Sequence, residues 1–461
     1  MRGDKFNFVS LYANKFSAAL FCFFGGLLCE LWIHLNPIYG PSLFRRLPST
    51  ERRLDMLLTP EIKPYMNFTI DFLVDETLRE GAERSAFAVT EESRFRLLKK
   101  MIDAGLREFV LGISPETPEL LKMSLQAKHA GVFPIDCKFI WIALLNSWET
   151  TYDYIKTFPE AFLKDFTISF GMIELKSDQC LFEMVIEKFR RIGIKYFKAS
   201  ILVNFKSGIE ANYEKIDTQM RRCLDNGLDV IRINDSVGAL FPESTDALCR
   251  RLVSDYPKIN FCLHAHDDRG LAVANSLASV YAGFNMIEGS LAGLGNRAGL
   301  PSVELLAKIA QDKEITFGNV TLAVDRLIEV SRLADEIFMN IPNTYRPVSG
   351  LFVDRVNFGV LNIPDYLEAY GERQYVMNIA AIHPKTVQDA LRAICFDADK
   401  INDKRFIAEM MEVLRSSMQK TYENETPTYQ ALMGQIKTFY SHAWLSLDDI
   451  RSIAMSLAPS N

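Results

Sequence analysis

Residues 263–270 read Leu-His-Ala-His-Asp-Asp-Arg-Gly, and they follow the largely apolar run 259–262. Side chains two residues apart on a strand point to the same face, so His264 and His266 are expected to project side by side from the end of one strand. Two neighbouring imidazoles are half of a metal site. The chain has only six histidines, which makes this spacing unexpected from composition alone. The alternative is a pair of polar residues on an exposed strand.

The strand before these histidines is one of a series of apolar, strand-like segments that alternate with amphipathic helical segments, which is the pattern of a parallel α/β fold. We predict strands at 68–77, 108–114, 136–144, 166–174, 196–203, 229–235, 260–267 and 286–293. We predict helices at 91–104, 118–130, 178–192, 213–226, 242–256, 271–282 and 301–311. Thr90 is expected to cap the first of these helices, and five glycines are expected to end helices: Gly105, Gly131, Gly193, Gly227 and Gly283.

Strand–helix units repeated eight times in about 250 residues predict a (β/α)8 TIM barrel as the catalytic domain, which we place at residues 66–315. A doubly wound open sheet is less favoured, because no glycine-rich phosphate loop follows the first strand. The alternation stops after the barrel, and residues 316–461 are expected to form an accessory, mostly helical region. Within it we predict helix at 316–339 and from 386 onward, with Ser446 and Asp449 capping the last helix.

Residues 1–65 differ from the rest of the chain. The apolar run 16–29 is flanked by Lys15 and Glu30 and is shorter than the roughly twenty residues that a membrane-spanning helix needs. It is read as a targeting segment, a surface segment or non-native sequence ahead of a start at Met66. Any membrane contact is expected through this extension alone.

Composition narrows the partners and the compartment. The net charge of −6, without Lys/Arg blocks, gives no reason to expect nucleic acid as a partner. The eight cysteines include no pair at two-residue spacing, which argues against a zinc cluster or a disulfide framework. A reducing, cytoplasmic location is the simpler expectation.

The carboxyl ends of barrel strands carry the working groups. Arg79 and Glu80 follow the first predicted strand, and His264 and His266 end the seventh. One carboxylate and two imidazoles leave positions open for water and substrate, so Glu80, His264 and His266 are predicted to hold a catalytic divalent cation, Mg, Mn or Zn. Such an ion would polarise a carbonyl and hold a developing enolate, with Arg79 neutralising charge. Arg79 and Glu80 taken alone also fit a surface ion pair.

Two further strand ends suggest substrate contacts. Ser236 follows the sixth predicted strand, where its hydroxyl would hydrogen-bond a substrate carboxylate or cap a turn. Residues 293–299 follow the eighth strand and read Gly-Leu-Gly-Asn-Arg-Ala-Gly, whose glycines let the backbone approach a ligand closely.

Four segments together resemble the DRE-TIM metallolyase superfamily over roughly residues 68–312: Asp-Glu-Thr-Leu-Arg-Glu-Gly at 75–81, Asp-Ser-Val-Gly at 235–238, His-Ala-His-Asp-Asp-Arg-Gly-Leu-Ala-Val-Ala-Asn at 264–275, and 293–299. That superfamily includes isopropylmalate and homocitrate synthases, hydroxymethylglutaryl-CoA lyases and 4-hydroxy-2-oxovalerate aldolases. The resemblance places Glu80, His264 and His266 on metal-ligand positions and Arg79 on the catalytic arginine. Ser236 falls where the family usually has a threonine that contacts the oxo acid. The resemblance also implies a homodimer.

The branch signals conflict. Glu80, in place of an aspartate, and the apolar Leu300 are similar to the homocitrate branch, whereas residues 290–295 resemble the lyases, whose loop cysteine is absent here. Leu202 stands where the synthases carry a glutamate, with Asn204 the nearest polar residue.

Two histidines of the synthases also lack counterparts. Ile173 and Glu174 occupy the place of their strand-four histidine, and the stretch 353–360 lacks their tail histidine. His383 is displaced from that position and is expected to start a helix, because Pro384 follows it.

The resemblance favours an acyl-CoA:2-oxo acid C-acyltransferase, an enzyme that condenses an acyl-CoA with a 2-oxo acid. The second hypothesis is a metal-dependent carbon–carbon lyase or aldolase that runs the chemistry backwards. The third is a non-catalytic barrel with a binding role, which the intact quartet of Arg79, Glu80, His264 and His266 argues against.

Overall fold

The computed structural model describes residues 68–171, 181–318, 320–353, 355–357, 372–374 and 382–458. The chain divides into two units, Met1–Tyr65 and Met66–Asn461, and all described residues belong to the second. The predictions made for residues 1–65 therefore lie outside the described residues.

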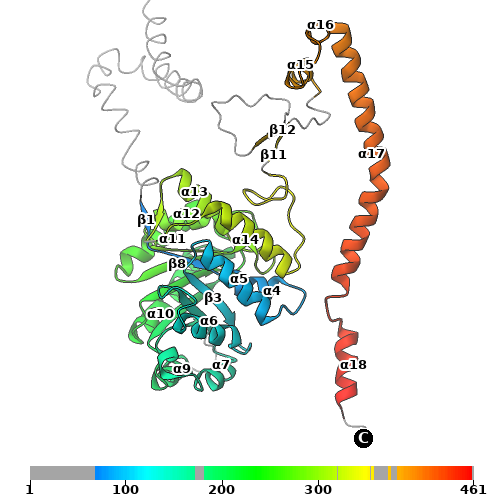
Figure 1. Cartoon of the computed structure of the whole chain (residues 1–461). Helices are drawn as coiled ribbons and strands as arrows, with labels where there is room; N and C mark the ends of the chain where they lie inside the picture. Colours follow the sequence, from blue (N-terminus) through cyan, green and yellow to red (C-terminus); the bar gives the residue numbers. More distant parts are fainter. Residues whose placement is uncertain are drawn as a thin grey trace, which may run out of the picture. The chain divides into compact units, whose positions relative to one another are not determined.

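Eight parallel strands close into a barrel (Figure 1), which confirms the predicted fold class. Each strand pairs with the next along the chain, and the last pairs with the first through Phe72↔Met286 and Asp75↔Gly289. The barrel strands are β2 (Phe72–Asp75), β3 (Glu108–Ile113), β4 (Lys138–Leu144), β5 (Thr167–Gly171), β6 (Tyr196–Val203), β7 (Val230–Asp235), β8 (Asn260–Ala265) and β9 (Met286–Gly289).

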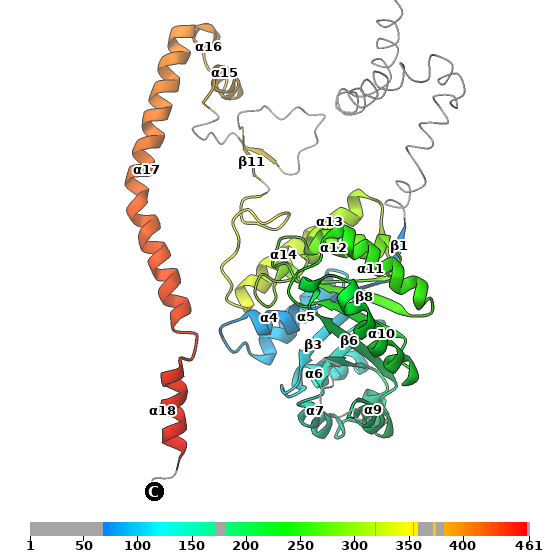
Figure 2. The ribbon, with the colours of Figure 1, turned by 180° about the vertical axis from the view of Figure 1, so that it is seen from behind.

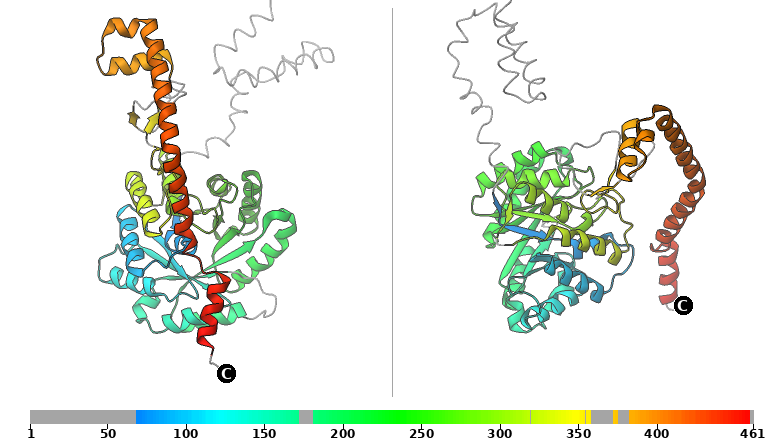
Figure 3. Two further views of the ribbon diagram at one scale, coloured as in Figure 1. Left: turned by 90° about the vertical axis from the view of Figure 1, so that its right-hand side faces the viewer. Right: turned by 45° about the horizontal axis from the view of Figure 1, so that its top comes forward.

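Helices cover the outside of the barrel (Figures 2 and 3). Those between the barrel strands are α4 (Thr77–Arg84), α5 (Glu91–Asp103), α6 (Glu119–His129), α7 (Trp148–Ile155), α8 (Glu160–Leu163), α9 (Leu181–Arg191), α10 (Glu210–Asp225), α11 (Pro242–Asp255) and α12 (Ala272–Tyr281), and α13 (Val303–Asp312) follows β9. The Thr90 side chain caps α5 by accepting from the Ser93 amide at 3.3 Å. The five glycines expected to end helices all have positive φ angles, which glycine adopts at little steric cost.

The inner face of the barrel changes from apolar to polar along the strands. A buried cluster inside the barrel includes Val74, Val110, Ile142 and Cys262. On β8, the residue two positions beyond Cys262 is His264, which shares its face because side chains alternate along a strand. The apolar cluster therefore packs the middle of the barrel, and the next layer toward the carboxyl ends of the strands carries polar groups.

The prediction of helix from residue 316 was wrong at its start. Thr316–Phe317 forms a short strand, β10, that pairs in parallel with β1 (Thr69–Ile70). The hydroxyls of Thr69 and Thr316 lie 2.8 Å apart across this pair. Helix α14 begins only at Val324 and runs to Ile337. A pairing partner far away in the sequence has overridden the local helical pattern.

The remaining described residues are mostly helical, as predicted. They form a short parallel pair, β11 (Arg355–Asn357) and β12 (Glu372–Gln374), and the helices α15 (Pro384–Ala393), α16 (Ala398–Asn402), α17 (Lys404–Ser441) and α18 (Leu447–Leu457). Ser446 and Asp449 form the predicted capping box at the start of α18. Among the described helices, none combines the length and apolar character needed to cross a membrane.

Candidate active site

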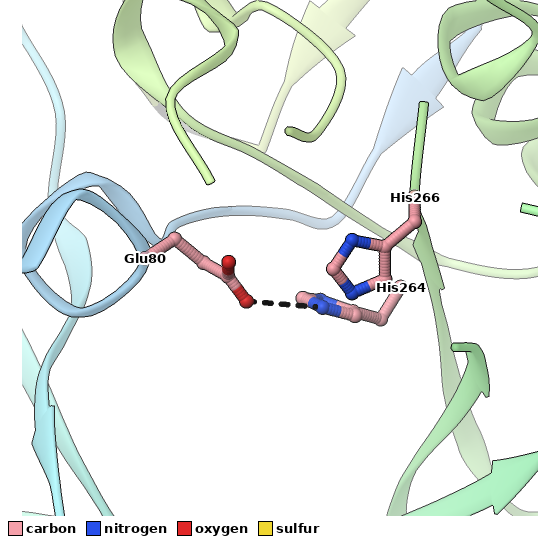
Figure 4. Close-up of side chains that lie close together, drawn as sticks. All are labelled: Glu80, His264 and His266. Carbon is pink, nitrogen blue, oxygen red and sulfur yellow. Dashed lines mark ion pairs between the residues drawn. The ribbon is translucent and has the colours of Figure 1, made fainter. Parts of the chain in front are cut away.

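His264 and His266 lie at the carboxyl end of β8, His264 within the strand and His266 one residue beyond it. Their rings stand nearly perpendicular, at 81°, with centroids 5.0 Å apart (Figure 4). His264 is 2% exposed and His266 is 8% exposed. The two imidazoles are therefore buried side by side, and they are not polar residues on an exposed strand.

Arg79 and Glu80 lie in α4, the helix that follows β2. The turn from strand to helix is fixed by Asp75, whose carboxylate accepts from the Thr77 amide at 2.8 Å and from the Thr77 hydroxyl at 2.9 Å. Arg79 is 6% exposed and Glu80 is 1% exposed. Such burial is incompatible with a surface ion pair.

The carboxylate of Glu80 joins the arginine to the histidines. Its Oε1 lies 2.6 Å from Arg79 Nη1. The same oxygen lies 3.4 Å from His264 Nε2 (Figure 4). Its Oε2 accepts from the Asn296 amide at 2.8 Å. One ligand atom each from Glu80, His264 and His266 can be chosen so that all three lie within 4.8 Å of one another.

The glycine-rich turn at 293–299 holds Glu80 from the other side. A Cβ atom on Gly295 would lie 3.0 Å from Glu80 Oε2, and one on Gly299 would lie 1.9 Å from the Gly293 carbonyl oxygen. Gly299 also has φ +93°, a conformation that other residues rarely adopt. The turn therefore requires glycine, and its close fit brings the Asn296 amide onto the carboxylate.

Electrostatics keep two of the three groups, Glu80 and His266, in states that can bind a cation, whereas hydrogen bonds to Glu288 and Glu80 raise the pKa of His264 although burial opposes them. Burial raises the pKa of Glu80, but the charge of Arg79 and the hydrogen bond from His264 lower it by more. The pKa of Glu80 therefore lies well below its usual value. Burial and the neighbouring His264 lower the pKa of His266 to about 4. Glu80 is thus an anion and His266 a neutral imidazole at neutral pH.

The donor set fits a divalent cation. One carboxylate and two imidazoles are ligands that such ions accept, and three protein ligands leave coordination positions open. His266 Nδ1 is buried and has no hydrogen-bond partner within the described part of the chain. A buried polar atom without a partner is costly unless a ligand satisfies it.

Ser236 lies at the same end of the barrel. It directly follows β7, where Asn234 and Asp235 pair in register with His264 and Ala265. Its carbonyl oxygen accepts from Arg297 Nη2 at 2.7 Å, whereas its buried hydroxyl has no partner among the described residues. Among the described residues, the hydroxyl therefore makes no hydrogen bond that would cap a turn.

Several positions depart from the pattern of the superfamily that the sequence resembles, and the structure describes four of them. Leu202, near the end of β6, pairs in register with Asn234 and is 36% exposed. The Asn204 side chain caps a short 3-10 helix, η3 (Phe205–Ser207), by accepting from the Lys206 amide. The His383 ring accepts from the Lys385 amide at 3.3 Å and caps α15, which confirms its prediction as a helix-start residue. Leu300 is buried.

The comparison with the strand-four histidine, at Ile173 and Glu174, falls outside the described residues. So do residues 354 and 358–360 of the stretch 353–360.

Sequence reasoning missed the charged residues beneath the candidate metal ligands. Glu288 Oε2 lies 3.0 Å from His264 Nδ1, and Glu288 Oε1 accepts from Lys198 Nζ at 3.0 Å. Arg232 donates to Glu76. The available signal was the presence of single charged residues within otherwise apolar strands, where they had to be buried.

The chain matches the HMGL-like family model over residues 72–334. It is 28% identical to homocitrate synthase of Saccharolobus islandicus over 306 residues, which are 63% of this chain and 64% of the relative. It is 28% identical to homocitrate synthase of Sulfolobus acidocaldarius over 341 residues, 70% of each chain. A solved structure, hydroxymethylglutaryl-CoA lyase from Pseudomonas aeruginosa, aligns with a TM-score of 0.49 and 18% identity, covering 62% of this chain and 99% of the lyase. The chain thus spans about two thirds of the length of the curated relatives.

Proposed function

The chain belongs to the HMGL-like family, and from this premise we propose that it is a metal-dependent C-acyltransferase that condenses an acyl-CoA with a 2-oxo acid. The observation that carries the proposal is the buried quartet of Arg79, Glu80, His264 and His266 at the carboxyl end of the barrel strands. The relatives at 28% identity are homocitrate synthases, which favours the condensing direction.

Glu80, His264 and His266 would hold the divalent cation, Mg, Mn or Zn. When bound, the ion supplies a Lewis acid that makes the carbonyl carbon of an oxo acid more electrophilic. Glu80 contributes the negative charge of the site, and the amide of Asn296 orients that carboxylate. The depressed pKa of His266 keeps its lone pair available at neutral pH.

Arg79 would stabilise negative charge on the reacting oxygen. Its guanidinium is held by carboxylates on two sides, with Nε donating to Glu76 at 2.9 Å and Nη1 2.6 Å from Glu80. Its Nη2 lies 2.7 Å from Glu76 but makes no hydrogen bond of acceptable geometry within the described residues. A preorganised donor in a buried site is worth most at the moment when charge develops. The free hydroxyl of Ser236 would bind the carboxylate of the oxo acid.

Release of free CoA tests the reaction. We expect thiol release from acetyl-CoA that requires both a 2-oxo acid and a divalent ion, at about 1–100 turnovers per second for the preferred substrate. The assay follows thiol colorimetrically with pyruvate, 2-oxobutyrate, 2-oxoisovalerate and 2-oxoglutarate, and omission of the oxo acid or addition of a chelator gives the blanks. Cleavage of a hydroxy acid without thiol release would support the lyase or aldolase, which the absence of a carboxylate at Leu202 also favours. A bound ion with turnover of neither substrate class would support the binding protein.

We also propose that the protein is a cytoplasmic homodimer. Large apolar side chains on α17 and α18 are exposed, including Tyr422 and Tyr429 on the first and Leu447 and Leu457 on the second. Exposed apolar surface of this kind is typical of an interface with another chain. Light scattering should give twice the chain mass of 52.5 kDa, and a mass equal to one chain would refute the dimer.

A further inference from the structure

A chain of buried charges links Arg79 to His264 beneath the metal ligands. Glu76 accepts from Arg79 Nε through Oε2 at 2.9 Å and from Arg232 Nη1 through Oε1. Arg232 Nη1 also lies 3.5 Å from Glu288 Oε2. That same oxygen of Glu288 lies 3.0 Å from His264 Nδ1.

Glu80 closes this chain into a ring. Its Oε1 is 3.4 Å from His264 Nε2 and 2.6 Å from Arg79 Nη1. The six side chains of the ring are each 7% exposed or less: Arg79, Glu76, Arg232, Glu288, His264 and Glu80. Buried charges on neighbouring positions of such a ring depend strongly on one another, because removing one partner leaves the next uncompensated.

Arg232 occupies the position opposite Glu80 in the ring. It lies on β7, and its Nε donates to the Ser200 hydroxyl at 2.8 Å, which fixes the plane of the guanidinium. Its Nη1 is the group that approaches both Glu76 and Glu288. Lys198, by contrast, is paired with Glu288, 3.0 Å away. Among the ion pairs of the described residues, Arg232 alone bridges the carboxylates of Glu76 and Glu288.

This arrangement explains a second cluster of potential ligand atoms. Oxygen or nitrogen atoms of Glu76, His264 and Glu288 also lie within 4.8 Å of one another. The carboxylate of Glu76, however, already faces Arg79 and Arg232. The carboxylate of Glu288 already faces Lys198. Three cations leave no net negative charge to attract a metal ion, so this cluster is an ion-pair network that supports the site above it.

We propose that Arg232 is a positioning residue that holds the two halves of the site in one arrangement. Through Glu76 it fixes the guanidinium of Arg79. Through Glu288 it fixes the ring of His264, whose Nδ1–H donates to Glu288 and whose Nε2 is thereby presented to the metal. A carboxylate behind a ligating histidine orients the ring and makes it a better ligand. The role assigned to Arg79 rests on the proposed function, whereas the role at His264 requires only metal binding.

Two isosteric variants, Glu288→Gln and Glu76→Gln, and one variant that removes the guanidinium, Arg232→Gln, separate the effect on His264 from the effect on Arg79. The probes are Mn²⁺, titrated calorimetrically into the metal-free full chain, and oxalate, an enolate-like dianion titrated into the Mn²⁺-loaded chain. We expect Glu288→Gln to weaken Mn²⁺ binding by about 10- to 100-fold. We expect Glu76→Gln to keep Mn²⁺ affinity within about threefold and to weaken oxalate binding about tenfold through Arg79. We expect Arg232→Gln to weaken both, by similar factors.

Lys128→Gln is the matched control. Lys128 is a buried cation on α6 that lies 2.7 Å from Asp165, away from the ring. Its removal should lower the melting temperature without changing either affinity more than twofold. Circular dichroism and thermal unfolding check that each variant is folded. If Arg232→Gln does not fold, the opposite responses of Glu76→Gln and Glu288→Gln to the two probes carry the test.

The proposal is overturned if folded Arg232→Gln keeps both affinities within twofold. It is also overturned if Glu76→Gln and Glu288→Gln each weaken Mn²⁺ binding and oxalate binding equally. Its failure is distinct from that of the proposed function. A wild-type chain that binds Mn²⁺ and oxalate in the expected pattern, but releases no thiol from any acyl-CoA, refutes the acyltransferase and leaves the role of Arg232 standing.

Discussion

The double variant His264→Ala/His266→Ala is expected to lose its bound divalent ion. Wild-type chain should carry about one ion, and removal of two of three protein ligands should weaken binding by well over 100-fold, since disturbing only the groups behind a ligand costs 10- to 100-fold. Glu80 alone, already paired with Arg79 at 2.6 Å, has little charge left to hold a cation. Elemental analysis after gel filtration, with magnesium, manganese or zinc supplied, measures the content directly.

His383→Ala provides the control for this experiment. His383 caps α15 and belongs to a different part of the fold, so its replacement should leave the metal content unchanged. Because both site histidines are buried, circular dichroism must show that the double variant keeps its secondary structure. Equal metal content in the double variant and the wild type would refute the site, and absence of metal from both would remove the basis of the proposed chemistry.

The barrel was predictable, and the candidate metal ligands could be singled out, because their signals are local. Each strand–helix unit repeats within a short segment, so the alternation of apolar and amphipathic stretches fixed the strands to within a few residues. The spacing of His264 and His266 is likewise a property of one strand. The capping roles of Thr90, Ser446 and His383 depend on the next three residues alone.

The features that sequence reasoning missed depend on distant contacts. Thr316 forms a strand because it pairs with Thr69, 247 residues earlier. The pair between Arg232 and Glu76 spans 156 residues and exists only because the barrel closes. A single charge in an apolar strand shows that a partner must exist, but its identity comes from the packing of the strands. Local patterns therefore single out the candidate metal ligands, and closure of the barrel determines which charged groups hold them in place.

Arg79→Gln is expected to lower kcat by about 100- to 1,000-fold while the chain keeps its metal, because removal of one preorganised donor to a developing oxyanion has effects of that size. Arg79 is not among the proposed metal ligands, so metal content should stay near one ion per chain. Steady-state thiol release, with acyl-CoA and oxo acid varied separately, distinguishes a loss in kcat from a change in KM. An effect confined to KM would mean that Arg79 binds substrate equally in the ground state and the transition state.

Arg84→Gln is the matched control for the arginine. Arg84 ends the same helix, is exposed, and donates to the carbonyl oxygen of Arg297. Its replacement should change kcat less than threefold. Arg79→Lys adds a second comparison, since a lysine keeps the charge but cannot reproduce the paired contacts that the guanidinium makes with Glu76. If Arg79→Lys retains full activity, charge alone suffices, and the orientation imposed by Glu76 has no part in catalysis. If it is as impaired as Arg79→Gln, the fixed geometry of the guanidinium is what the reaction requires.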